Sequence, residues 1–329
     1  MLLHNQTQAI QRMNTLAKEG KDFIFIINYK ADSAYIEEFT NIDPRELLFS
    51  FPTLSNIPKA ESYSNEAVEW HTEPLTRDDY EHRINLVKQR EREGDSYLAN
   101  LTCKIPIRTN LSLHDIFMRS KALYRCWMKE KFVCFSPEIF VRINREGLIS
   151  SFPMKGTIDA TRPDAEKELM ENKKEAAEHA TIVDLIRNDL SMIAEKVQVK
   201  RYRYVDHLTT NKGEILQTSS EIIGQLSVDY RQNIGTLLFR LLPAGSITGA
   251  PKPRTMEIID EAEGYERGFY TGVMGCYNQG QLDSAVMIRF IDQDKDGQLH
   301  YKAGGGITAQ SNNDDEYKEL IEKVYVPIY

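Results

Sequence analysis

Near the end of the chain the sequence reads Ala303-Gly304-Gly305-Gly306-Ile307, and after a polar run it continues as Glu316-Tyr317-Lys318-Glu319-Leu320-Ile321-Glu322-Lys323-Val324. Three consecutive glycines can turn backbone N–H groups inward with no side chain in the way, which predicts a concave anion site. The second segment predicts a helix in which Glu316, Glu319 and Lys323 share one face. Two like charges on one helix face repel, and a divalent cation would relieve that repulsion.

Two interpretations of this stretch stay open. In one, backbone amides hold an anion next to a metal ion held by carboxylates; in the other, a solvated acidic helix follows a flexible loop. A second acidic segment bears on the choice. Residues 164–180 predict a charged helix in which Glu175 and Glu178 repeat the spacing of Glu316 and Glu319. Two helices from distant parts of the chain, each with a carboxylate pair, could cap one hard cation with oxygen ligands.

The composition indicates the broad class of protein. The chain has 329 residues, 41% of them hydrophobic, and a formal net charge of −8, which suits a soluble globular protein of one large or two smaller domains. The sequence shows no membrane-length apolar run and no secretory signal, so we expect a cytoplasmic protein. The acidic balance argues against nucleic-acid binding. The four cysteines lack CxxC spacing and are expected to be reduced core residues.

The pattern of apolar runs and turn residues predicts an α+β fold. Strands are expected over 23–27, 97–107, 131–143, 148–152, 197–204, 214–226, 270–277, 284–291 and 299–303. Helices are expected over 4–19, 76–93, 113–124, 164–180, 181–190, 255–262 and 316–324. Long antiparallel hairpins with separate helices predict large antiparallel β-sheets that form a two-sheet core, with helices on the outside and the active site between core and helices.

The N-terminal part has a different character. Residues 30–75 contain Pro44, Pro52, Pro58 and Pro74 and predict an irregular segment. We therefore expect residues 1–75 to form a short N-terminal covering segment, which belongs to the same domain as the catalytic part at 76–329.

Four further features carry a functional and a structural interpretation each. Glu138 follows a strand-breaking proline and could point out of its sheet or be an ordinary edge acid. Lys155 lies between a strand end and Gly-Thr, at a pocket mouth or on plain surface. Arg289 lies within the apolar strand 284–291, where an anionic ligand or a structural salt bridge would satisfy it. The Gly-rich loop 245–253 precedes a helix start, which is a favourable place for an anion.

Together these segments resemble the chorismate-utilising enzymes, the family of aminodeoxychorismate and anthranilate synthase component I and of the isochorismate and salicylate synthases. The resemblance spans about residues 94–325, in family order. It rests on Pro153–Thr157, Ile182–Leu190, Gly245–Lys252, Met256–Asp260, Ala303–Ile307 and Glu316–Glu319. Lys155 stands where the aminodeoxychorismate synthases have lysine and the anthranilate synthases alanine. The resemblance therefore implies amination of chorismate at C4, on the route to para-aminobenzoate and folate.

The resemblance also implies roles for individual residues. Glu178 and Glu319 would bind Mg²⁺ directly, and Glu175 and Glu316 would act through water. Lys155 would attack C2 as a neutral amine and expel the C4 hydroxyl, with Glu138 as the acid, before ammonia displaces the lysine. The remaining substrate contacts that the resemblance implies are Arg289, Tyr277, Gly304, Gly306, Lys323, Thr248, Thr157 and Gln217.

Two departures from the family pattern qualify this interpretation. Gln217 stands where many members carry a histidine, and an amide cannot transfer protons, which disfavours the anthranilate reaction. The tryptophan-binding elements of longer relatives are not evident in residues 1–75, so we expect no such regulation.

The partners and the alternatives follow from the same comparison. No cysteine follows a glycine-rich nucleophile turn, so ammonia would come from free ammonium or from a separate glutamine amidotransferase subunit. Two alternatives to amination at C4 remain. One is a sister enzyme that makes anthranilate or an isochorismate-type product, and the other is an inactive module that binds chorismate or a protein partner.

Overall fold

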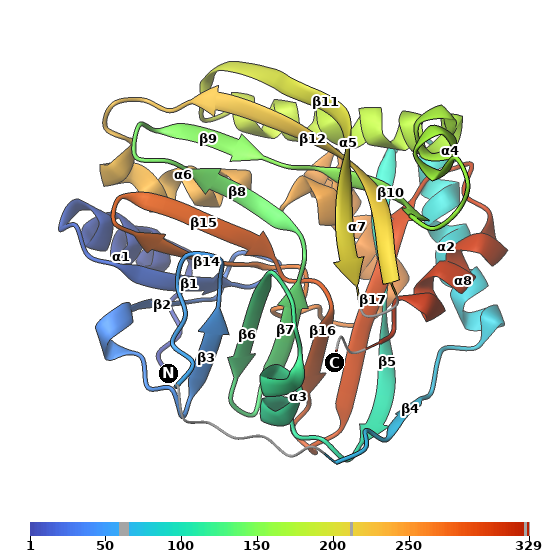
Figure 1. Ribbon diagram of the computed structural model, residues 1–329, viewed down its shortest axis with the longest axis horizontal. Coiled ribbons are helices and arrows are strands. Elements are labelled where there is room, and N and C mark those ends of the chain that lie inside the picture. The colour runs from blue at the N-terminus through green and yellow to red at the C-terminus, as the bar shows by residue number, and fades with distance from the viewer. Residues whose placement is uncertain (59–65, 211–212, 326–327, 329) are drawn as a thin grey trace.

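A computed structural model describes residues 1–58, 66–210, 213–325 and 328. Two large antiparallel sheets form the body of the molecule, and helices lie outside them (Figure 1), so the predicted α+β class and two-sheet core are confirmed. None of the helices among the described residues is long and apolar enough to cross a membrane.

In the described residues the first sheet has nine strands. Their spatial order is β10 (Met154–Asp159), β12 (Gly213–Gln225), β9 (Leu148–Ser151), β8 (Ile139–Ile143), β15 (Gln281–Val286), β14 (Val273–Asn278), β1 (Phe23–Ile27) and β2 (Ala34–Glu38), with β11 (Glu195–Thr210) paired to β12.

The second sheet has eight strands within the same described ranges. Their order is β13 (Gly249–Ala250), β5 (Leu98–Thr109), β17 (Leu299–Ile307), β16 (Phe290–Gln293), β7 (Phe132–Ser136), β6 (Tyr124–Met128) and β3 (Leu47–Ser50), with β4 (Trp70–Thr72) paired to β5.

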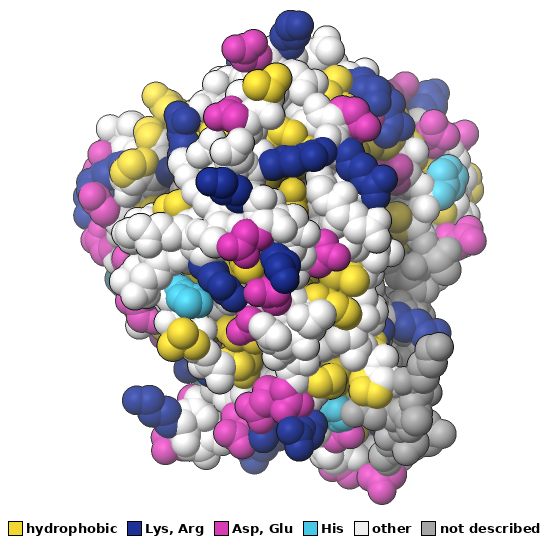
Figure 2. Space-filling view, turned by 90° about the vertical axis from the view of Figure 1, so that its left-hand side faces the viewer, with side chains coloured by type: hydrophobic (Ala, Val, Ile, Leu, Met, Phe, Trp, Pro, Cys, Tyr) yellow, Lys and Arg dark blue, Asp and Glu magenta, His cyan; other side chains and the backbone are white. Residues whose placement is uncertain are grey.

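The helices cover the outer faces and one end of the sheets (Figure 1). They are α1 (Gln6–Lys18), α2 (Arg77–Arg92), α3 (Leu113–Arg119), α4 (Ala165–Glu171), α5 (Lys173–Ser191), α6 (Ile234–Leu241), α7 (Lys252–Glu263) and α8 (Asn313–Glu322). Figure 2 views the molecule from one side and shows basic and acidic side chains interspersed over that face. Among the surface ion pairs are those of Arg12 with Glu37 and Glu38, which join α1 to β2.

The apolar run of β1 shows how the layers pack. All five of its residues are buried, since the strand is covered on both faces. Ile24 and Ile26 join the cluster between the two sheets, with Phe49 and Phe290 of the opposite sheet. Phe23, Phe25 and Ile27 belong to the outer cluster, which contains α1 and α6. A continuous apolar strand without alternation is therefore the signature of this three-layer burial.

Several sequence-based predictions of secondary structure are wrong. The described part of residues 30–75 is not irregular throughout, because β2, β3 and β4 lie there and pair into both sheets. The break between the acidic helices falls at Asn172, which caps α5 through Glu175 N–H, rather than at residue 180. The predicted helix 113–124 ends at Arg119, and α6 was not anticipated.

Candidate active site

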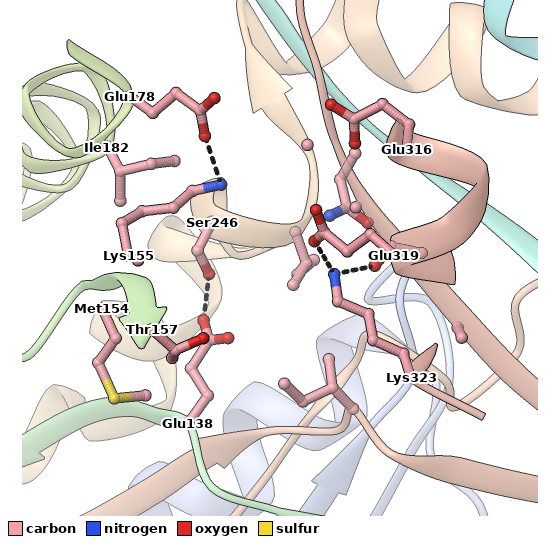
Figure 3. A pocket seen from close by; sticks show the side chains of 18 of the residues that line it. Glu138, Met154, Lys155, Thr157, Glu178, Ile182, Ser246, Glu316, Glu319 and Lys323 are labelled. Atoms are coloured by element: carbon pink, nitrogen blue, oxygen red, sulfur yellow. Dashed lines mark hydrogen bonds and ion pairs between the residues drawn. The ribbon is translucent and has the colours of Figure 1, made fainter. Parts of the chain in front are cut away.

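A cavity of about 780 Å³ lies between the two sheets' edges and helices α5 and α8 (Figure 3). Its lining side chains come from elements far apart in the sequence. Helices α5 and α8 approach it from opposite sides. The predicted site residues that line it are Glu138, Lys155, Thr157, Glu175, Glu178, Gln217, Arg289, Gly304, Gly306, Glu316, Glu319 and Lys323.

The glycine run is a strand rather than a loop. Gly304 pairs with Thr102 of β5 and Gly306 with Asn100, while β16 pairs with β17 only as far as Lys302. The Gly304 carbonyl accepts a hydrogen bond from Lys323 Nζ at 2.9 Å, so it points away from β5. In a strand the N–H of a residue points to the same side as its carbonyl, and the direction repeats every second residue. The N–H groups of Gly304 and Gly306 therefore face the open edge at the cavity.

Gly305 lies opposite the charged groups of α8. A Cβ at this position would lie 3.7 Å from Glu316 Oε2, 3.7 Å from Glu319 Oε1 and 3.6 Å from Lys323 Nζ. These three groups come from α8 and the residue that caps its C-terminus. The middle glycine therefore leaves open the space into which α8 projects its charged side chains.

Lys155 enters the cavity from β10 at a local irregularity. Gly156 has φ +74°, and the pairing of β10 with β12 shifts register between Lys155 and Thr157. Such a bulge re-aims a side chain. Lys155 Nζ lies 3.2 Å from Glu178 Oε2 (Figure 3), and a Cβ at Gly306 would be 3.7 Å from that nitrogen. Burial lowers the pKa of Lys155, but the charges of Glu178 and the other glutamates outweigh it, so the pKa is raised.

Glu138 and Arg289 lie where two neighbouring strands pass from one sheet to the other. β7 of the second sheet leads through Glu138 into β8 of the first, and β15 leads through Arg289 into β16 in the reverse direction. Val286 N–H donates to the Glu138 carbonyl and Phe135 N–H to the Arg289 carbonyl, both at 3.1 Å. Both side chains therefore start from the corner between the sheets, beside the cavity.

At this corner Glu138 accepts a hydrogen bond of 2.6 Å from the Ser246 hydroxyl (Figure 3). Burial raises the pKa of Glu138, against the lowering effect of that bond and of the charges on Lys155 and Lys323. A raised pKa favours the protonated carboxyl group, which is the form that can donate a proton. Ser246 was not among the predicted site residues, although it lies within the Gly245–Lys252 segment.

The prediction that Arg289 lies within a strand is wrong. Residues 287–289 separate β15 from β16, and Arg289 has φ +54°. Its Nη1 donates to the Lys323 carbonyl at 3.2 Å, and its guanidinium lies 5.2 Å from the centre of the Tyr325 ring. These contacts fix the guanidinium at the C-terminal end of α8, where it lines the cavity.

Tyr277 and Thr248, for which the resemblance implies substrate contacts, are not among the residues that line the cavity. Tyr277 stacks on Phe23 at 5.3 Å between ring centres and belongs to the outer core, because its position in β14 faces the helices α1 and α6. Thr248 is fully buried beside the Tyr29 hydroxyl, and its neighbours Ile247 and Gly249 line the cavity instead.

The loop before α7 also differs from the predicted anion site. Gly245–Ile247 forms a 3₁₀ turn, and β13 pairs with β5. Lys252 at the start of α7 donates to the Leu241 carbonyl and pairs with Asp189 at 2.8 Å. These contacts engage the Lys252 side chain, whereas no side chain caps the start of α7. Cavity-lining residues that the sequence did not single out include Asn100, Lys174, Tyr270, Tyr301 and Glu322.

The four predicted metal ligands line the cavity in two pairs. Among the described residues, His, Cys, Asp and Glu side chains form no group of three or more with a metal-binding arrangement. Glu319 instead pairs with Lys323 at 2.6 Å, as Glu178 does with Lys155. Burial raises the pKa of Glu175 and Glu316, and the neighbouring charges of Glu178 and Glu319 add to this effect. A set of hard oxygen donors with excess negative charge fits Mg²⁺ in type.

Comparison with known proteins identifies the family. A model of the chorismate binding enzyme family matches residues 5–328. Two uncharacterised PabA-like proteins are 45% identical: that of Haemophilus influenzae over 324 residues, with 97% of this chain and 96% of the relative covered, and that of Pasteurella multocida over 319 residues, with 97% and 98% covered. Aminodeoxychorismate synthase component 1 of Bacillus subtilis is 30% identical, with 77% of this chain and 55% of the relative covered.

Solved structures agree in fold. The menaquinone-specific isochorismate synthase MenF of Escherichia coli superposes with a TM-score of 0.75 at 17% identity, covering 98% of this chain and 82% of that one. Anthranilate synthase component I of Streptococcus pneumoniae gives 0.64 at 26% identity, with 81% and 61% covered. With the family match over nearly the whole length and the cavity built from its motif residues, the chain belongs to the chorismate binding enzyme family.

Proposed function

We propose that the protein catalyses the Mg²⁺-dependent amination of chorismate at C4 with ammonia, giving 4-amino-4-deoxychorismate. The observation that carries the proposal is the placement of Lys155 and Glu138 in one cavity, so that an amine and a carboxyl group line the same space (Figure 3). The similarity to an aminodeoxychorismate synthase supports the same reaction.

In this reaction Lys155 is the nucleophile. Its neutral amine attacks C2 of the ring, the double bonds shift, and the C4 hydroxyl leaves with its bonding electrons. Glu138 gives that hydroxyl a proton, so that it departs as water rather than as hydroxide. Ammonia then bonds to C4, the double bonds shift back, and the Lys155 nitrogen leaves C2.

The dianionic substrate needs positive charge in a cavity rich in carboxylates. Arg289, Lys323 and the free N–H groups of Gly304 and Gly306 lie on the side of β17 and α8 and would bind the enolpyruvyl carboxylate. Glu178 and Glu319, supported by Glu175 and Glu316, would hold Mg²⁺. Bound there, the ion would neutralise the ring carboxylate and compensate the charge that raises the pKa of Lys155.

The ammonia would come from a separate glutamine amidotransferase subunit or from free ammonium. A glutaminase needs an activated cysteine, but all four cysteines are buried in strands. Burial raises the pKa of Cys103 and Cys276 to about 12 each, and raises those of Cys126 and Cys134 as well. These thiols are suited to packing rather than to nucleophilic attack.

The test is to incubate the purified protein with chorismate, Mg²⁺ and ammonium and to identify the product by liquid chromatography and mass spectrometry. We expect aminodeoxychorismate, and no product when Mg²⁺ is chelated. Anthranilate or isochorismate as the main product would assign a sister reaction, and unchanged chorismate would assign a binding module.

A further inference from the structure

A second, much smaller cavity lies directly behind Glu138. Its volume is about 20 Å³, and Glu138, Pro153 and Ser246 line both this cavity and the main one. Its far wall is formed by the end of α5, which contributes Asp189, and by the residues before the 3₁₀ turn. The general acid of the proposed reaction therefore separates the substrate space from an inner compartment.

The compartment has the size and polarity of a water site. A volume above about 10–15 Å³ holds one water molecule when polar partners are present. The polar residues that line it are Glu138, Asp189 and Ser246, and the Ser246 hydroxyl donates to the Glu138 carboxyl group at 2.6 Å. Asp189 is itself held by Lys252 Nζ at 2.8 Å, and Lys252 also donates to the Leu241 carbonyl.

If the protein catalyses the proposed reaction, Glu138 needs a route by which it regains its proton. Glu138 loses one proton for each hydroxyl that leaves as water. Ammonia adds to C4 as neutral NH₃, and the primary amine that forms stays protonated near neutral pH. The product therefore leaves with an ammonium group at C4. Glu138 therefore has to recover its proton from solvent in every turnover. Each ammonium ion releases one proton to solvent when it becomes NH₃. That release balances the proton that Glu138 takes up.

We propose that the small cavity holds a single water molecule through which Asp189 returns a proton to Glu138. In this step the Asp189 carboxylate first takes a proton from solvent, to which 13% of its side chain is exposed. It passes this proton to the water, and the water gives one of its own protons to the Glu138 carboxylate. Burial raises the pKa of Asp189 against the effect of Lys252, and raises that of Glu138 against Ser246, Lys155 and Lys323, as a relay between two acids needs.

The deciding experiment compares the first turnover with later ones in the Asp189→Asn variant. Asparagine keeps the size of the side chain and its oxygen for Lys252 but cannot carry the proton. The relay is needed only after Glu138 has given up its first proton, so the first turnover in rapid mixing with chorismate, Mg²⁺ and ammonium should match wild type within about twofold. The steady-state rate should then fall at least about tenfold, and this slow phase should be slower still in D₂O.

Two further variants keep the test decisive. Ala244→Val adds two methyl groups to a buried residue that lines the compartment, and it should give the same burst with Asp189 intact. Asp283→Asn removes another buried acid, which pairs with Arg142 at 2.9 Å and does not line the compartment, and it should give no burst.

Several results would overturn the relay. Equal slowing of the first and later turnovers in Asp189→Asn would show a structural role, and no slowing or a slow phase insensitive to D₂O would remove the relay altogether. Failure of the proposed function is seen separately, since wild type would then form no aminodeoxychorismate before any variant is compared.

Discussion

Lys155 Nζ lies 3.2 Å from Glu178 Oε2, so the proposed nucleophile and a proposed metal ligand form an ion pair. The pair joins β10 to α5, and α5 is fixed to the sheet by a hydrogen bond of 2.7 Å between His179 Nε2 and Ser220 Oγ. An amine paired with a carboxylate is protonated and cannot attack. Binding of a cation to Glu178 would release it, so metal binding would activate the proposed nucleophile.

The first prediction concerns the covalent role of Lys155. Incubation of wild type with chorismate and Mg²⁺ in the absence of ammonia should give an adduct on the peptide that contains Lys155, seen by mass spectrometry. Lys155→Ala should form no adduct and lose aminodeoxychorismate formation by at least about a hundredfold. Lys174, which also lines the cavity and lies 3.8 Å from Glu178, supplies the matched control as Lys174→Ala. Full activity in Lys155→Ala would exclude the nucleophile.

The second prediction concerns the metal. Glu178→Gln should abolish Mg²⁺-dependent turnover while the protein stays folded, because the amide oxygen of glutamine can still accept the hydrogen bond from Lys155. Isothermal titration with Mg²⁺ should show binding to wild type and weaker binding to this variant. Glu168→Gln, on α4 in a surface ion pair with Arg162, is the control and should bind Mg²⁺ as wild type does. Equal Mg²⁺ affinity in all three proteins would contradict the assignment.

The third prediction separates two neighbouring glycines of β17. A Cβ at Gly304 would lie 2.3 Å from the Leu101 carbonyl oxygen, so Gly304→Ala should lower the melting temperature. A Cβ at Gly305 meets nothing closer than 3.6 Å, so Gly305→Ala should keep the melting temperature. The new methyl group lies among Glu316, Glu319 and Lys323, however, and should reduce turnover about tenfold or more. Wild-type turnover in Gly305→Ala would show that the charged side chains of α8 beside Gly305 do not take part in the reaction.

These glycines also show what the sequence could and could not predict. The spacing of the glutamates on α5 and α8 follows from helix geometry, and their placement in one cavity agrees with the family motifs. The strand at Gly304–Gly306 could not be predicted from the sequence, because glycine has a low strand propensity. Long-range pairing with β5 decides the conformation of this segment.

The position of Tyr277 was missed for a related reason. Strand periodicity tells which residues share a face, but not which face turns to the cavity once a strand is covered on both sides. Tyr277 stacks on Phe23 in the outer core. For Arg289 the predicted secondary structure is wrong, because the strand expected around it is broken at the corner between the sheets. Its guanidinium nevertheless lines the cavity.

The fourth prediction concerns stability and pH. Glu91 on α2 is 8% exposed, and burial raises its pKa to about 8, offset in part by the Ala99 N–H and by Lys88. The unfolded chain ionises this acid near its ordinary value of 4.5, so its contribution to stability falls as the pH rises from about 4.5 to about 8 and then levels off. Glu91→Gln should therefore raise the melting temperature more at pH 8.5 than at pH 4, roughly the limits of that range. An equal change at both values would show that Glu91 does not titrate in this range.

The last prediction concerns the source of ammonia. The purified protein with chorismate, Mg²⁺ and glutamine, but no ammonium and no partner, should release no glutamate, since its cysteines are buried and their pKa values are raised. With ammonium it should turn over, and at equal total ammonium the rate should rise with pH because the share of NH₃ rises. Addition of a glutamine amidotransferase subunit should make glutamine a substrate. The control is Cys103→Ala, which should leave ammonium-dependent turnover within about twofold of wild type, because its thiol only packs. Sustained glutamate release by the chain alone, lost in any single cysteine variant, would reveal a glutaminase site and refute the two-subunit proposal.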